Sequence, residues 1–395
     1  APRHLRAVAG CYFVASFAAL GLPPYLTEIL PALGDEDGRW AGLLYVVPTV
    51  FSALGGPLWG RLADRFGHKP LLLRAQLGLT AAFVLAGLAD SLPLFAAALV
   101  LQGVLGGTYA ASTGYLGAAV PDRAAMSRAL TLMQVAARAS LVAAPIAVGA
   151  LSPWLPPQRQ YLVLAVLPLA AALMLTALPS PPRNAGERQG RAPREQARVA
   201  RVAARTGLRG RHPVGLYLLE FGFVFSTVVS FPYLVDLVQQ AAPGAPAGLA
   251  GALFALPHLC FLLAAMPLHD RLTRRPHTSL VAGLALVSLG LLGHATAATV
   301  TDLVLVRTCF GAGLTLGLVG LSALAAEASR GRPPGSLFGW VELFSKAGAV
   351  ASGVVATVTN AAWGPAGPVV AGAIAALALA VGSTLVRPSR PLPST

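Results

Sequence analysis

Long stretches without a charged side chain constrain the fold of this 395-residue chain more than any other feature. No residue between Ser91 and Val120, for example, is Asp, Glu, Lys or Arg. About 20 apolar residues are enough for an α-helix to cross the hydrocarbon core of a bilayer. Charged residues make up only 11% of the chain, against about 25% in soluble domains. We therefore expect an all-α membrane protein, because a helix in lipid satisfies its own backbone hydrogen bonds.

Hydropathy and the positions of the charges predict twelve transmembrane helices. Glycine and proline are frequent, with 42 and 32 residues, which is typical of close-packed and kinked membrane helices in a chain this apolar. The predicted spans are 7–28, 40–59, 71–89, 92–119, 127–151, 159–178, 213–238, 247–267, 278–299, 302–326, 337–360 and 364–386.

The formal net charge is +14, and its placement predicts the orientation of the chain. Basic residues favour the cytoplasmic ends and loops of membrane proteins. With both termini cytoplasmic, all but five of the 29 lysines and arginines lie on the cytoplasmic side; the exceptions are Arg39, Arg138, Arg159, Arg307 and Lys346. We therefore expect a multi-pass protein of a bacterial-type inner (plasma) membrane, whose positive charge meets lipid headgroups rather than nucleic acid.

One polar segment, residues 179–212, divides six predicted spans from six. Nine arginines lie between Arg183 and Arg211, several of them three or four residues apart. This spacing places them on one face of a helix, which predicts a basic surface helix against anionic lipid, with binding of a partner or ligand as the alternative.

The two halves on either side of this linker resemble each other at an offset near 209. The sequence PYLTE at Pro24–Glu28 recurs as PYLVD at Pro232–Asp236. AGLLYVVP, which begins at Ala41, recurs as AGALFALP, which begins at Ala250. Repeats with an even number of spans are parallel and meet around a central cavity. The repeat predicts two pseudo-symmetric six-helix bundles, residues 1–178 and 213–395, joined by the cytoplasmic linker 179–212.

The loop between the second and third spans carries the most specific motif. It reads GRLADRFGHKP from Gly60 to Pro70 and resembles the G-x-L-a-D-r-x-G-r-k-p loop of the major facilitator superfamily. Gly60 and Gly67 are expected to permit a tight turn. In that family the loop latches the two halves on the cytoplasmic side. The resemblance therefore implies the family's fold, a monomeric transporter, and a gating role for Gly60, Asp64, Arg65, Gly67 and Lys69.

Two further motifs of the family are partial. Span 4 keeps Gln102 and Gly103, but Leu99 stands where the family has arginine. The G-P-x-x-G-G core of the fifth span is reduced to Pro145 and Gly149. With these departures, the chain resembles the drug/metabolite:proton antiporter branch.

Charged side chains inside the predicted spans are the candidates for cargo and proton binding. A charge at the centre of a helix costs roughly 2.5–3.5 kcal/mol on insertion scales, so each should face a cavity or a partner. Arg138 and Lys346 occupy repeat-related spans and are expected to face each other across the cavity. Glu342, one turn from Lys346, either neutralises it in a structural ion pair or shares a substrate- or proton-linked role.

The other candidates are polar side chains within spans. Glu220 either carries a proton or is a carboxylate at a helix end, Arg307 either packs or binds, and His258 either packs between helices or relays a proton. Hydrogen-bonding side chains expected to line the cavity are Gln102, Tyr109, Tyr115 and Gln134. Glu28 and Asp236 occupy equivalent outer helix ends, where a structural or gating role is expected.

The sequence contains no phosphate-binding loop, no metal-ligand spacing and no acyl-transfer nucleophile motif. We therefore expect a transporter rather than an enzyme, without a cofactor or metal and driven by a proton gradient. The resemblance implies export of a small organic solute, such as a metabolite, siderophore or drug, and the excess of cations over carboxylates within the spans favours an anionic or zwitterionic one. An importer of an organic anion or sugar derivative and a non-transporting receptor or scaffold are the alternatives.

Overall fold

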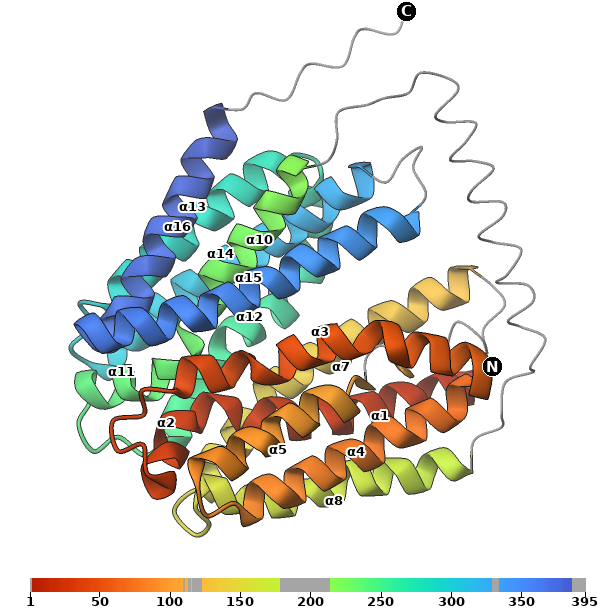
Figure 1. The fold of residues 1–395 in the computed structure, drawn as a ribbon. Coiled ribbons are helices and arrows are strands. Elements are labelled where there is room, and N and C mark those ends of the chain that lie inside the picture. The colour runs from red at the N-terminus through yellow and green to blue at the C-terminus, as the bar shows by residue number, and fades with distance from the viewer. Residues whose placement is uncertain are drawn as a thin grey trace, which may run out of the picture.

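The computed structural model describes residues 2–108, 111–112, 115, 123–177, 214–328 and 334–385. Every regular element within these residues is a helix (Figure 1). The predicted linker at 179–212 lies outside the described residues, so its basic surface helix and the domain boundaries on either side of it stay predictions.

The helices of the first half pack mainly against one another. In Figure 1 they form the lower bundle. Its elements are α1 (Pro2–Gly21), η1 (Pro23–Tyr25), α2 (Leu26–Ile29), η2 (Leu30–Leu33), α3 (Ala41–Phe66), α4 (His68–Leu88), α5 (Leu92–Leu105), α7 (Arg123–Leu151) and α8 (Pro157–Thr176).

The helices of the second half form the upper bundle, in which α13 and α14 share the most extensive contact (Figure 1). Its elements are α10 (Val214–Val228), η3 (Phe231–Tyr233), α11 (Leu234–Ala241), α12 (Ala247–Thr273), α13 (Pro276–His294), α14 (Val300–Ala328), α15 (Pro334–Trp363) and α16 (Ala366–Leu385).

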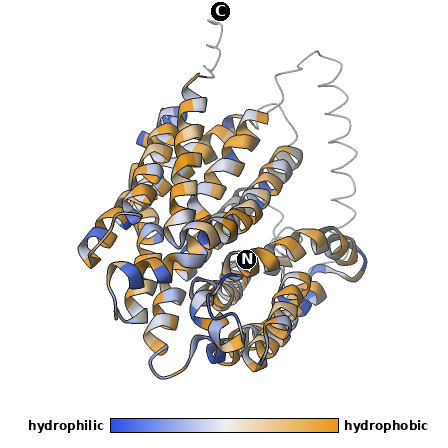
Figure 2. Ribbon diagram, turned by 60° about the vertical axis from the view of Figure 1, so that its left-hand side comes forward, coloured by the Kyte–Doolittle hydropathy of each residue, from blue (hydrophilic) through white to orange (hydrophobic). Residues whose placement is uncertain are grey.

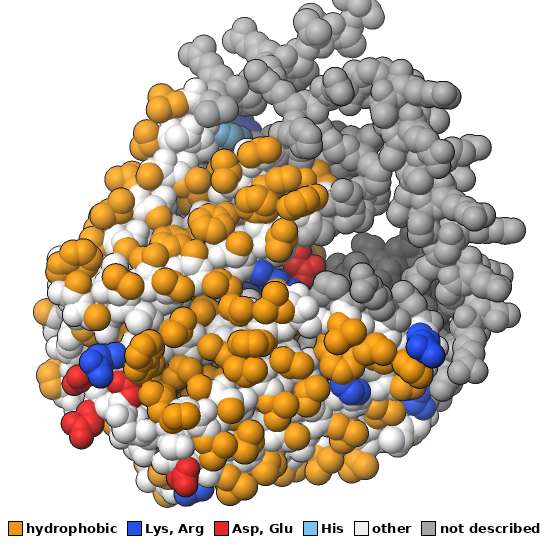
Figure 3. Space-filling model, in the orientation of Figure 1, with side chains coloured by type: hydrophobic (Ala, Val, Ile, Leu, Met, Phe, Trp, Pro, Cys, Tyr) orange, Lys and Arg blue, Asp and Glu red, His pale blue; other side chains and the backbone are white. Residues whose placement is uncertain are grey.

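The apolar character of the helices suits them to a bilayer. In the described part of the chain, nine helices are long and apolar enough to cross a membrane, and three shorter apolar helices lie at 41–55, 92–105 and 135–151. Figure 2 shows hydrophobic residues along the length of the helices of both bundles. The face shown in Figure 3 is covered mainly by hydrophobic side chains. The protein is therefore a multi-pass membrane protein of the predicted all-α class.

The internal repeat of the sequence has a structural counterpart. The first and seventh spans are both interrupted by a short 3-10 helix, η1 and η3, followed by a short α-helix, α2 and α11. Each 3-10 helix ends at the tyrosine of the repeated PYL sequence, Tyr25 or Tyr233. Proline lacks the N–H group that an α-helix needs, so the same residues interrupt both spans at the same place.

The two bundles touch mainly through two pairs of helices, α7 with α12 and α3 with α15, and also through the short helices η1 and η3. Glycines allow close approach in both pairs: a Cβ on Gly42 would lie 2.6 Å from the carbonyl oxygen of Gly353, and one on Gly251 would overlap that of Pro145. We call the end of the molecule defined by Gly42, Pro145, Gly251 and Gly353 the closed end. From it the bundles diverge towards their other ends (Figure 1).

The fourth span, predicted over 92–119, is interrupted: α5 ends at Leu105, where Gly106 and Gly107 follow and Gly107 has a φ of 68°, and the described residues 108, 111, 112 and 115 are again helical. One local prediction was wrong. Gly60 was expected in a tight turn, but α3 continues through it to Phe66. The helix ends only where Gly67 adopts a φ of 96°, a conformation that residues with a side chain rarely adopt.

Candidate functional site

Arg138 of α7 and His258 of α12 meet at the contact between the bundles. Arg138 Nη1 lies 3.4 Å from His258 Nδ1, and its guanidinium group lies 5.1 Å from the ring centre of Phe261. His258 is only 2% exposed. Arg138 lies seven residues before Pro145, and His258 seven residues after Gly251. Because seven residues make nearly two helical turns, both side chains continue the interface of the closed end towards the middle of the molecule.

The contact with Arg138 fixes the tautomer of a neutral His258. A guanidinium group only donates hydrogen bonds, so Nδ1 accepts and Nε2 carries the proton. His258 Nε2 is buried and has no hydrogen-bond partner among the described residues. Buried donors are nearly always paired, so Nε2 is a donor for which the described residues supply no acceptor.

Arg307 of α14 is the largest fully buried side chain in the described part of the protein. Its Nε donates to the carbonyl of Leu253 at 2.8 Å, and its Nη2 donates to that of Phe254 at 3.0 Å. Pro257 of α12 has no N–H, which leaves the carbonyl four residues earlier, that of Leu253, without its helical partner. Arg307 therefore caps a proline break in α12, which is a structural role.

One nitrogen of the Arg307 guanidinium group takes no part in this cap. Its Nη1 is buried without a hydrogen-bond partner, and no described carboxylate lies within ion-pair distance. Arg307 interacts electrostatically with His258. His258 therefore interacts with two cations, Arg138 and Arg307. Among the described residues, no carboxylate lies within 4 Å of either guanidinium group.

The structure gives Lys346 a partner on its own helix rather than across the molecule. Its Nζ lies 3.1 Å from Glu342 Oε1 in α15, and the side chains are 36% and 56% exposed. Gly353, which contacts α3, lies seven and eleven residues further along, close to two and three turns. Glu342 and Lys346 therefore point to the same side as Gly353, towards the first half of the chain, at a level where the bundles have begun to diverge.

Glu220 of α10 lies close to this pair along α15. It is half-buried and lies beside the hydroxyl group of Ser345. Tyr217 of α10 stacks on Phe344 at 5.4 Å, which fixes α10 against α15. The carboxyl groups of Glu220 and Glu342 therefore lie at a similar level along α15, beside Ser345 and Lys346 respectively.

The loop at Gly60–Pro70 is described in part. Lys69 Nζ donates to the carbonyl of Thr176 at 2.9 Å, at the end of α8, and Arg65 lies over the Phe66 ring at 5.4 Å. The side chain of Asp64 lies outside the described part of the structure. The gating role of the loop stays a prediction.

The polar side chains expected to line the cavity are only partly described. Gln102 is half-buried near the end of α5, and Tyr115 is buried. Tyr109 and the side chain of Gln134 lie outside the described residues. No group of three or more His, Cys, Asp or Glu that could hold a metal occurs in the described part of the chain.

Sequence reasoning missed Arg74 of α4. Its guanidinium group lies 3.6 Å from the ring centre of Trp59, and its Nη1 donates to the carbonyl of Leu105 at 2.8 Å. Trp59 Nε1 donates to the neighbouring carbonyl of Val104 at 2.7 Å. The two side chains cap the end of α5. An arginine inside the third predicted span was the signal that could have identified it.

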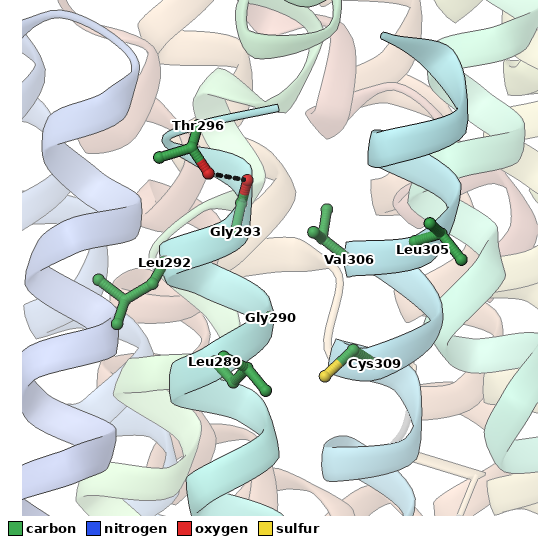
Figure 4. Close-up of a pocket in the computed structure, with 8 residues that line it drawn as sticks. All are labelled: Leu289, Gly290, Leu292, Gly293, Thr296, Leu305, Val306 and Cys309. Atoms are coloured by element: carbon green, nitrogen blue, oxygen red, sulfur yellow. Dashed lines mark hydrogen bonds between the residues drawn. The ribbon is translucent and has the colours of Figure 1, made fainter. Parts of the chain in front are cut away.

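A pocket between α13 and α14 contains none of the predicted site residues (Figure 4). Its lining is almost entirely apolar, and Leu289, Leu292 and Leu305 are 60%, 44% and 63% exposed. It is lined by Leu289, Gly290, Leu292, Gly293, Thr296, Leu305, Val306 and Cys309.

Helical bundles with this arrangement are found in known transporters. A POT family transporter in complex with 5-aminolevulinic acid superposes with a TM-score of 0.73 over 97% of this chain and 96% of that one, at 13% identity. The human organic anion transporter MFSD10 (TETRAN) superposes with a TM-score of 0.63 over 95% of this chain and 98% of that one, at 18% identity. At these identities the likeness shows the fold alone.

The sequence comparison is more specific. The Major Facilitator Superfamily model matches residues 8–242, and the chain belongs to that family. Multidrug resistance protein MdtG of Erwinia billingiae is 37% identical over 116 residues, 28% of each chain, and that of Klebsiella pneumoniae is 32% identical over 146 residues, 36% of this chain and 35% of the relative. The matched segments thus span about a third or less of these relatives.

Proposed function

We propose that the protein is a proton-coupled secondary transporter that exports a small anionic or zwitterionic organic solute by alternating access. The observation that carries the proposal is a buried cluster beside the contact of α7 with α12, where the two cations Arg138 and Arg307 interact with His258 and have no described carboxylate partner.

An anionic group is the ligand that this cluster fits best. Uncompensated cations in a membrane protein are costly, and they usually mark a substrate or ion site. His258 Nε2 and Arg307 Nη1 are both donors without a described partner. A carboxylate accepts such bonds and also neutralises charge, whereas a lipophilic cation would do neither.

Proton coupling is assigned to the carboxyl groups of Glu220 and Glu342. Glu342 pairs with Lys346 on α15, Glu220 of α10 lies beside the neighbouring Ser345, and neither carboxyl group is fully buried. A carboxyl group in a cavity that opens alternately to two solutions can take up a proton on one side and release it on the other. Export is the direction supported by the relatives, whose names describe multidrug resistance.

The cargo class is tested by ligand-dependent thermal stability of the purified protein. We expect organic acids to raise the melting temperature, at two pH values, more than neutral or cationic compounds of similar size. Arg138→Gln should abolish this shift, because it removes the cation most accessible from between the bundles. Arg271→Gln, an exposed position on α12, is the control and should keep it. Stabilisation by cationic compounds alone would refute the anionic cargo.

The direction is tested in membrane vesicles with an imposed proton gradient. A proton antiporter that exports its cargo should accumulate a stabilising acid in inverted vesicles that are acidic inside. Accumulation confined to right-side-out vesicles, together with proton entry, would instead establish an importer.

A further inference from the structure

Two buried tyrosines occupy equivalent places in the two halves, but they form different hydrogen bonds. Tyr25 ends η1 and Tyr233 ends η3, and both are 0% exposed. Both belong to the repeated PYL sequence. Each hydroxyl group lies at the closed end, and buried hydroxyl groups of this kind are nearly always paired.

The hydroxyl group of Tyr233 joins the two halves. It donates to the carbonyl of Arg39 at 3.0 Å and accepts from the N–H of Gly42 at 3.2 Å. Arg39 and Gly42 flank the start of α3 in the first half, whereas Tyr233 belongs to the second. The N–H groups of the first helical turn have no partner within the helix, so Tyr233 supplies one for α3 from the opposite half.

The hydroxyl group of Tyr25 bonds within its own half. It donates to the carbonyl of Pro145 in α7 at 2.7 Å. The second half contributes Gly251 to this place, and a side chain there would overlap both Tyr25 and Pro145. Gly251 therefore packs against the pair, and the hydrogen bond itself does not cross between the halves.

From this asymmetry we infer that Tyr233 is a positioning residue for the transport cycle. Its hydroxyl group holds the closed end together, and its two hydrogen bonds must break whenever that end opens. The Tyr25 hydrogen bond remains intact in both states, because α1 and α7 move as parts of one bundle. The inference rests on the proposed alternating access, and it does not depend on the cargo.

The test compares Tyr233→Phe with Tyr25→Phe in the full-length protein. Both changes remove one hydroxyl group and keep the buried ring, so they are matched in size and burial. Spin labels on Trp154→Cys and Trp363→Cys, in a background without native cysteines, report the separation of the two halves at the ends of α7 and α15. These two positions are 79% and 73% exposed.

We expect Tyr233→Phe to raise the ratio of open to closed populations about two- to tenfold, the factor for losing hydrogen bonds of ordinary net strength. Tyr25→Phe should lower the melting temperature without changing the ratio. An unchanged ratio in Tyr233→Phe, or an equal change in both variants, would overturn the inference. A wild-type protein whose closed end never opens, with any organic acid or at any pH, would instead refute alternating access.

Discussion

Arg74 shows how one side chain defines the end of a membrane helix. The last carbonyl groups of a helix have no partner within it, and in lipid they cannot be left to water. Arg74 donates to Leu105 while its planar guanidinium group stacks on Trp59. Both contacts at once need a planar group that can stack on a ring and donate a hydrogen bond, and the ammonium group of lysine is not planar.

We therefore predict that Arg74→Lys destabilises the protein by about 1–2 kcal/mol, although the charge is kept. The measurement is the thermal unfolding of the detergent-purified protein. Arg65→Lys is the matched control, because its guanidinium group lies over the exposed ring of Phe66 at a longer 5.4 Å. Equal melting temperatures for the two variants would show that the cap does not depend on the guanidinium group.

A second test at the residue scale asks whether the Glu342–Lys346 pair is structural or takes part in transport. Ion pairs this exposed contribute about 0–1 kcal/mol to stability. The exchanged variant Glu342→Lys with Lys346→Glu keeps the pair on the same helix face. If these groups bind cargo or carry protons, the exchange should leave the melting temperature within a few degrees and abolish transport. Retained transport would assign the pair a structural role only.

At the scale of elements, glycine decides how closely α13 and α14 approach. A Cβ on Gly283 would overlap the backbone nitrogen of Gly317, and one on Gly290 would lie 2.8 Å from the backbone nitrogen of Phe310. Backbone atoms cannot rotate away as side chains can. Small residues at such contacts are what allow membrane helices to gain van der Waals attraction along their length.

Gly283→Ala should therefore destabilise the protein by about 2 kcal/mol or more. Gly382→Ala in α16 adds the same methyl group where nothing lies within 4 Å, and it should be neutral or stabilising by up to about 1 kcal/mol. Denaturation monitored by tryptophan fluorescence compares the two. If both variants lost stability, the cause would be the alanine side chain in a helix of this protein and not the close contact between α13 and α14.

The positions of the helices could be predicted from the sequence where residues close together in the chain determine them. Hydropathy defines the spans, and the repeated PYL sequence marks the interruption at Tyr25 and at Tyr233, because both effects act within a few residues. The end of α5 and the partner of Arg138 were not predictable. They depend on Arg74 and His258, which contact residues about 30 and 120 positions away once the helices have packed.

At the scale of the whole molecule, the closed end and the predicted orientation together define a conformational state. Arg39, Trp154 and Gly251 lie at or near loops that the charge distribution places outside the cell. The bundles are joined at that end and diverge from it (Figure 1). If the termini are cytoplasmic, the space between the bundles opens to the cytoplasm, and the structure is the inward-facing state of a transporter.

This state predicts which positions a membrane-impermeant maleimide reaches. After replacement of Cys11, Cys260 and Cys309 by serine, a cysteine in place of Glu342 lies on the face of α15 that points between the bundles. It should react in inverted vesicles and stay protected in right-side-out vesicles, because the closed end bars the other route. Trp154→Cys, in the loop after α7 and 79% exposed, should give the opposite pattern.

Reversed labelling of Trp154→Cys would show that the protein has the opposite orientation in the membrane to the predicted one. Labelling of Glu342→Cys from both sides would instead show that the closed end opens in the resting protein, since a change in topology alone cannot expose one residue to both solutions.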